Sequence, residues 1–271
     1  MRAASLLRRL GHGVQIGAVF RHRRRREIDE AVEEAALLIA AHLRTDLDVD
    51  AQLVRIDQIA SGCDASLDSI LTHLFDDLAY RGNVSRYYDP ANSCLDHVMD
   101  SGSGIPITLS VLLMAVARRH GRTMEGIGMP GHFLVRDVQT GVYIDAFDHG
   151  RRLDGDGCCD LYQRIGGDPR HWDQSFLEPV GAVAIVRRML NNLISIGLRE
   201  HDRATVAIAS RLRADLPDAS VAERAEFATA LALSGEPTRA AGVLEALAAE
   251  APSEEAEALL TAAARFRASL N

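Results

Sequence analysis

The chain has 271 residues, of which 47% are apolar and 25% charged, a composition typical of a soluble globular protein with room for two domains. It holds no apolar run long enough to cross a membrane. The net charge of −8 is unevenly distributed, because residues 1–26 hold eight arginines and no acidic residue. The remainder is strongly acidic, so we expect no nucleic-acid partner for it.

The basic segment 1–26 has several interpretations: an arm that binds lipid or nucleic acid, a targeting segment, or a disordered tail ahead of the folded domain. Because glycines interrupt its pattern, we expect the disordered tail. All 30 basic residues are arginine, so the chain cannot form an internal Gln–Lys isopeptide bond. The four cysteines lack metal-ligand spacing, which favours a reduced, cytoplasmic protein without a cofactor.

Helical periodicity dominates the first eighty residues. Apolar side chains recur at three- and four-residue spacing over 27–43, again after Asp50, and again over 67–78. The segment 87–93 is polar and rich in turn residues, which predicts a loop, and 95–99 follows as a short helix.

An almost wholly apolar run extends from Pro106 to Ala117, after a glycine-rich turn at 101–104. Proline is favoured at the first position of a helix, and the run ends in two arginines and then Gly121. These signals predict a buried central helix. Short strands are predicted at 124–128, 133–138 and 142–144, so the fold class is α+β: a helix packed on a small antiparallel sheet.

From Val183 onward the chain is rich in alanine, leucine and arginine and lacks strand signals. Pro217 and Pro252 lie 35 residues apart, close to the tetratricopeptide period, and two helix pairs precede a last helix at 254–269. This pattern predicts an all-α region of tetratricopeptide-like repeats with a final capping helix.

His132 and Asp145 are the residues best placed for chemistry. His132 lies at the start of one predicted strand and Asp145 ends the next, so antiparallel pairing would bring imidazole and carboxylate within hydrogen-bond reach. A nucleophile at the start of the preceding helix would complete a Cys-His-Asp arrangement for acyl transfer. The alternative is that the two residues form a satisfied polar pair that holds two strands together.

The chain resembles the SirB1-type transglutaminase-like proteins over about residues 27 to 260. The resemblance rests on five ordered motifs: YRGN at 80–83, YYDPANS at 87–93, GIPITLS at 104–110, GIGMPGHFLVR at 126–136 and IDAF at 144–147. Similar segments at either end, ALLIA at 36–40 and RMLNNL at 188–193, extend it. It implies a papain/transglutaminase-like core over 27–180, followed by tetratricopeptide-like helices over 181–271. The arm at 1–26 lies outside it.

Through this resemblance, His132 and Asp145 match the histidine and aspartate of the transglutaminase superfamily. The superfamily cysteine falls on Pro106, so the nucleophile is expected to be absent and the pair to be the remnant of a triad. SirB1-type proteins share this proline. The chain departs from the family at Ala146, where proline is usual, and at Cys94, where an aromatic residue is usual.

Two alternatives keep a reaction open. Cys94, Ser110 or Thr108 could replace the missing thiol, provided that a base and an oxyanion hole lie about 3 Å away. A zinc site could draw on side chains whose spacing matches no compact motif, namely His132, Asp145, Asp148, His149 and Cys158.

The sequence therefore favours a non-catalytic module that binds a protein or peptide partner, without a metal and without the activity of a classical transglutaminase. The alternative is an active amidase, peptidase or transglutaminase-like hydrolase with a displaced nucleophile. A structural or regulatory protein without a ligand is the third possibility. Neither the partner nor the oligomeric state follows from the sequence.

Overall fold

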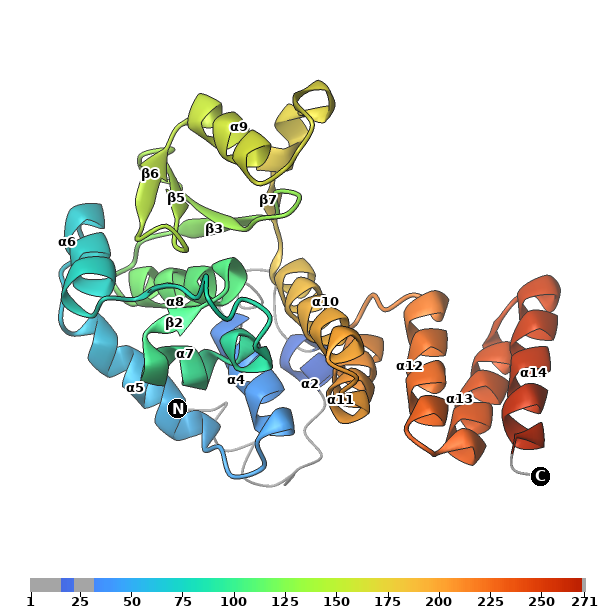
Figure 1. Ribbon diagram of the computed structural model, residues 1–271. Coiled ribbons are helices and arrows are strands. Elements are labelled where there is room, and N and C mark those ends of the chain that lie inside the picture. The colour runs from blue at the N-terminus through green and yellow to red at the C-terminus, as the bar shows by residue number, and fades with distance from the viewer. Residues whose placement is uncertain (1–15, 22–31, 270–271) are drawn as a thin grey trace. The chain divides into compact units, whose positions relative to one another are not determined.

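The computed structural model describes residues 16–21 and 32–269 (Figure 1). The chain divides into two compact units, which are described separately. The first unit holds the described residues from Val32 to Met189, and the second holds Ile16–Arg21 together with the chain from Leu190 onward.

The first unit begins with helices at the predicted places. Asp48 caps one of them by accepting a hydrogen bond from the Ala51 amide, and Ser66 caps another in the same way. The predicted segment 27–31 lies outside the described residues. The helices are α4 (Val32–Leu43), α5 (Val49–Ala60), α6 (Leu67–Leu71) and a π-helical turn (Thr72–Asp77).

The central helix of the first unit is α8 (Pro106–Arg119), which is buried along almost its whole length as predicted. It follows the shorter helix α7 (Leu95–Ser101), whose C-cap Gly102 adopts the left-handed conformation that favours glycine. Helix α8 packs against α4, α5 and two strands of the sheet.

The main sheet is antiparallel, in the order β6-β5-β4-β3-β7. Its strands are β3 (Met124–Ile127), β4 (Leu134–Asp137), β5 (Tyr143–Asp145), β6 (Arg151–Leu153) and β7 (Pro179–Val180). The three central strands confirm the prediction. The edge strands β6 and β7 were not predicted, because β6 begins with two exposed arginines and β7 has only two residues. A separate parallel pair joins β1 (Arg81–Gly82) to β2 (Ser103–Gly104).

Helix α9 (Gly155–Arg164) covers the face of the sheet opposite α8 (Figure 1). This helix was not predicted, because two glycines closely follow Asp154. Asp154 is an N-cap whose carboxylate accepts a hydrogen bond from the Gly157 amide, so the glycines begin the helix. The helix buries Cys158, Leu161 and Tyr162 against strand residues.

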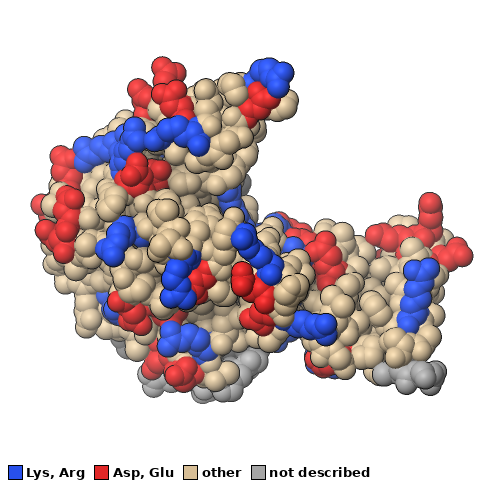
Figure 2. All heavy atoms as spheres, viewed as in Figure 1, with Lys and Arg blue, Asp and Glu red and all other residues tan. Residues whose placement is uncertain are grey.

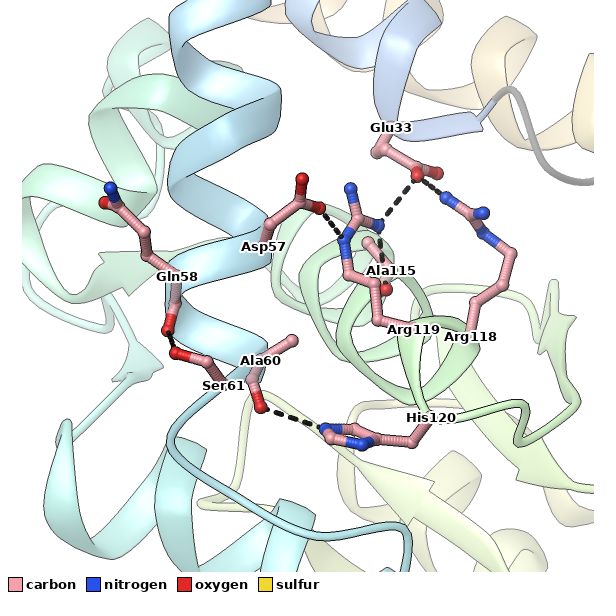
Figure 3. A network of polar contacts seen from close by, with 9 residues as sticks. All are labelled: Glu33, Asp57, Gln58, Ala60, Ser61, Ala115, Arg118, Arg119 and His120. Carbon is pink, nitrogen blue, oxygen red and sulfur yellow. Dashed lines mark hydrogen bonds and ion pairs between the residues drawn. The ribbon is translucent and has the colours of Figure 1, made fainter. Parts of the chain in front are cut away.

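Charged side chains tie α8 to the helices beside it (Figure 3). The buried carboxylate of Glu33 on α4 pairs with Arg118 and, at 3.0 Å, with Arg119. Arg119 Nε also donates to Asp57 Oδ1 on α5 at 2.6 Å. His120 Nε2 donates to the Ala60 carbonyl oxygen at 2.9 Å. This network holds the C-terminal end of the central helix.

The second unit is helical. Its long helices are α10 (Ala182–Arg199), which begins in the first unit, α11 (Arg203–Ala214), α12 (Val221–Leu233), α13 (Pro237–Glu250) and α14 (Ser253–Ala268). From α11 onward each helix packs on the next. The core between α12, α13 and α14 is built on leucine and alanine side chains.

A short helix, α2 (Ile16–Arg21), lies within the segment expected to be a disordered tail. Ile16 and Val19 are buried, and the Gly17 amide donates to Asp215 Oδ2 at 2.9 Å. The expectation of disorder is thus wrong for these six residues, because apolar side chains among them are buried. The other residues of 1–26 lie outside the described residues.

No helix in the described ranges has the length and apolar character needed to cross a membrane. On the face drawn in Figure 2, acidic and basic side chains are interspersed on both units.

Candidate functional site

His132 is presented by a tight turn at the start of β4. Gly131, directly before it, has a φ of 76°, a left-handed conformation that a side chain would strain. The amide of His132 donates to the Met129 carbonyl at 3.1 Å, which closes the turn. The ring is therefore held by backbone geometry rather than by a flexible loop.

The antiparallel register brings Asp145 to His132. Val135 on β4 pairs with Ile144 on β5, so the end of β5 lies beside the start of β4. His132 Nε2 is 2.9 Å from Asp145 Oδ1, and both side chains are buried. The sheet thus brings together the two residues that the sequence singled out.

The carboxylate of Asp145 has further donors. Its Oδ1 also accepts hydrogen bonds from the amides of Phe147, at 3.0 Å, and Asp148, at 3.3 Å. The other ring nitrogen of His132, Nδ1, has no hydrogen bond to any described residue. A histidine held in this way can accept or donate a proton at its free nitrogen.

The helix start presents no ionisable side chain. Pro106 occupies the first turn of α8, after Ile105 at the N-cap. Thr108 and Ser110 are fully buried, and neither hydroxyl has a hydrogen-bond partner in the described ranges. Neither therefore makes the hydrogen bond to His132 that a nucleophile activated by this base would need.

Cys94 is buried at the start of α7, and its Sγ lies 3.9 Å from the Pro90 carbonyl oxygen. Burial, followed by the charge of Asp96, raises its pKa to about 12. Cys158 is also buried, and burial followed by the charges of Asp154 and Asp145 raises its pKa to about 12. Both thiols are protonated near neutral pH. The described residues contain no group of three or more His, Cys, Asp or Glu side chains able to hold a metal.

An aromatic cluster, which the sequence analysis did not identify, adjoins the pair. It consists of Tyr87, Tyr88, His132 and Phe147. The Phe147 ring lies edge-on to His132, at 6.0 Å between centroids, and to Tyr87, at 5.9 Å. Tyr87 is 37% exposed and Tyr88 49% exposed. Two adjacent tyrosines in a predicted loop are a signal that could have pointed to this surface.

Asparagine side chains hold the tyrosine loop in place. Asn83 Nδ2 donates to Asn92 Oδ1 at 2.9 Å, and Asn92 Nδ2 donates to the Arg86 carbonyl at 2.6 Å. Asn92 is buried. Gly82 lets the Phe147 ring approach, because a Cβ there would lie 2.6 Å from ring carbons. The exposed tyrosines are thus carried on a rigid support.

Arg188 on α10 joins this arrangement from a distant part of the sequence. Its Nη2 donates to the carbonyls of Met129, at 2.9 Å, and His132, at 2.7 Å. The guanidinium carbon lies 5.6 Å from the centroid of the Phe133 ring. Burial lowers the pKa of Arg188, while the nearby Tyr87 opposes that shift. The resemblance to SirB1-type proteins included the segment that begins at Arg188, but it did not assign this residue to the site.

Comparison with known proteins places these residues in a family. The sequence profile of the transglutaminase-like superfamily matches residues 23–191. A UPF0162 protein of Xylella fastidiosa is 41% identical over 133 residues, which cover 46% of each chain. F-box only protein 21 of Mus musculus is 35% identical over 144 residues, 49% of this chain and 22% of the mouse protein.

A UPF0162 protein of Pseudomonas aeruginosa is 27% identical over 172 residues, which cover 60% of this chain and 63% of the relative. The chain thus spans less than two thirds of the length of these relatives. No solved structure matches it significantly.

Proposed function

The chain belongs to the transglutaminase-like superfamily, and from this premise we propose that residues 27–180 form a SirB1-type module that binds a protein or peptide without catalysing a reaction. In this proposal His132 and Asp145 are the remnant of a triad, and Pro106 stands where the superfamily has its nucleophile. Residues 181–271 would supply tetratricopeptide-like helices as a second docking surface.

The single observation that supports the proposal best is the surroundings of His132. Its Nδ1 makes no hydrogen bond to a thiol or hydroxyl among the described residues. Its ring contacts Phe147, on which the exposed Tyr87 packs. Exposed aromatic side chains on a rigid support are typical of binding sites, because they bury much area at little loss of conformational entropy.

Acyl transfer with a displaced nucleophile is the alternative. It needs an ionised thiol or an activated hydroxyl within about 3 Å of the base. The pKa of about 12 at Cys94 argues against a thiolate there. The unpartnered hydroxyls of Thr108 and Ser110 argue against their activation by His132.

Selection of peptides from a random display library on the purified full chain would test binding. We expect the selected peptides to lose at least about tenfold in affinity for Tyr87→Ala and Phe147→Ala, since truncation of a central aromatic contact costs about 2 kcal/mol. Val138→Ala is the matched control, because Val138 is 48% exposed and follows the opposite end of β4.

Two outcomes would contradict the proposal. One is unchanged affinity in both aromatic variants. The other is cleavage or transamidation of a selected peptide by the wild-type chain but not by His132→Ala, which would support the enzyme instead.

A further inference from the structure

Arg188 is a partly buried cation without a carboxylate partner. Of its hydrogen bonds to described residues, both are made by Nη2 and both go to neutral carbonyls. It makes no ion pair in the described ranges, whereas arginines elsewhere in the same unit pair with acidic side chains, as Arg122 does with Asp137. Removing a charge from water without pairing it is unfavourable, so an unpaired guanidinium calls for an explanation.

The guanidinium has donors left over. An arginine carries five N–H donors, and the two carbonyls use only those of Nη2. Nε and Nη1 have no acceptor among the described residues, and neither is sealed from solvent. Gly128 lies next to Nη1, since a Cβ at that position would be in van der Waals contact with it at 3.5 Å.

His132 links Arg188 to the aromatic cluster. The Nη2 group that anchors Arg188 binds the carbonyl of His132 itself. The His132 ring in turn lies edge-on to Phe147 at 6.0 Å, and Phe147 lies edge-on to Tyr87 at 5.9 Å, between ring centroids. A ligand that contacts the tyrosines at one end can therefore reach the guanidinium at the other.

We propose that Arg188 and the aromatic cluster together bind the C-terminal carboxylate of a peptide whose last residue is apolar. This inference rests on the proposed binding function and specifies its ligand. An anion complements the unpaired guanidinium, and a carboxylate forms a charge-assisted hydrogen bond with it. In a terminal residue the carboxylate and the side chain branch from one Cα, so a single residue supplies both the anion and the apolar group that packs on Tyr87 and Phe147.

Two small probes test the proposal on the intact, isotopically labelled protein. N-acetyl-L-phenylalanine carries the terminal carboxylate, and N-acetyl-L-phenylalanine amide replaces it by a neutral group of similar shape. We expect the acid to bind at least about tenfold more tightly than the amide. The acid should also shift the NMR signal of the Arg188 side-chain Nε–H at millimolar concentration.

A third probe, the α-amide of N-acetyl-L-glutamic acid, distinguishes the source of the carboxylate. Its acidic group is on the side chain, so we expect it to bind no better than the phenylalanine amide. Tighter binding of this probe than of N-acetyl-L-phenylalanine would overturn the assignment to a chain terminus.

Variants then locate the effect. Arg188→Gln should remove the preference for acid over amide, while Arg136→Gln should retain it, because Arg136 pairs with Glu125 on β3 and β4. The proposal is overturned if the wild-type protein binds acid and amide alike or binds neither, a comparison that needs no variant. It is also overturned if a folded Arg188→Gln protein keeps the preference.

The two proposals can fail separately. Equal binding of acid and amide, with both lost in Tyr87→Ala, would reject the carboxylate and keep the aromatic surface as a binding site. A preference for the acid that persists in Tyr87→Ala and disappears in Arg188→Gln would keep the anion site and reject the role of the tyrosines.

Discussion

Two pairs, each with a buried carboxylate, lie at opposite ends of strand β4: Arg122–Asp137 and His132–Asp145. They differ in whether their hydrogen-bonding groups all have partners. At the C-terminal end, Asp137 receives both Nε and Nη2 of Arg122, each at 2.7 Å. Thr140 adds its amide, at 2.9 Å, and its hydroxyl. At the N-terminal end, His132 binds Asp145 through one nitrogen and keeps the other free of described partners.

The difference separates a structural pair from a candidate site. The Asp137 carboxylate is saturated by its own chain and has no capacity for a ligand. The region around His132 has a free ring nitrogen, an unpaired guanidinium and exposed aromatic rings. Burial and a short hydrogen bond are common to both, so only the unused groups indicate function.

The largest expected effect is a difference in the rates at which two thiols are labelled, which tests whether the His132–Asp145 pair activates Cys94. With a pKa of about 12, Cys94 is ionised to only ~10⁻⁴ at pH 8, so iodoacetamide should modify it orders of magnitude more slowly than the partly exposed Cys159. Peptide mass spectrometry would measure both rates, and unfolded protein, where the two should react alike, is the control. If Cys94 were labelled rapidly in the wild-type protein but slowly in His132→Ala, the result would support a catalytic role for the His132–Asp145 pair.

Asp137→Asn should destabilise the protein by about 3 kcal/mol, because it removes the fully buried carboxylate that pairs with the part-buried guanidinium of Arg122. Denaturant unfolding at neutral pH would measure the loss. Asp68→Asn is the control: it breaks an exposed pair with Arg152, for which we expect less than about 1 kcal/mol. Similar losses in both variants would remove the distinction between a saturated pair and a surface pair.

The same carboxylate predicts a pH dependence. Burial alone would raise the pKa of Asp137, but the hydrogen bonds from Arg122 and Thr140 hold it below its usual value. The unfolded state therefore binds the proton more tightly, so this contribution is complete above the ordinary carboxyl pKa of about 4 and is lost as the pH falls through the lowered value. The free energy of unfolding should therefore fall less steeply with decreasing pH below about 4 in Asp137→Asn than in the wild-type protein, and denaturant unfolding at several pH values would measure the difference.

His132→Ala should lower the free energy of unfolding by only about 1 kcal/mol. Asp145 keeps the backbone donors of Phe147 and Asp148 after the imidazole is removed, so its carboxylate is not left unpaired. Denaturant unfolding would again give the value. A loss as large as that of Asp137→Asn would show that the two pairs are equally structural.

The smallest effect is expected for Arg136→Gln. Arg136 and Glu125 are each about one third exposed on neighbouring strands, and exposed pairs contribute less than about 1 kcal/mol. Unfolding should be nearly unchanged, which makes this variant a suitable control for Arg188→Gln. A large loss would show that the middle of the sheet depends on this pair as well.

Much of the architecture follows from local patterns. The apolar run after Pro106 predicted the buried helix α8, and short apolar segments between glycines predicted β3, β4 and β5. Because these strands are consecutive and antiparallel, their order also predicted that His132 and Asp145 meet. Helix α9 was missed because glycines at its start conceal a helix that Asp154 caps.

The sequence by itself determined the buried helix, the three central strands and the histidine–aspartate pair, because these depend on periodicity and on neighbouring strands. The superfamily followed from the resemblance of ordered motifs rather than from periodicity. Only the tertiary structure decided what surrounds that pair. Tyr87 and Arg188 lie a hundred residues apart in the chain, and no local pattern relates them. Arg188 bonds to the His132 carbonyl and Tyr87 packs on Phe147, which contacts His132, only because a helix and a loop distant in sequence pack on the same sheet. That packing leaves Arg188 without an ion pair among the described residues.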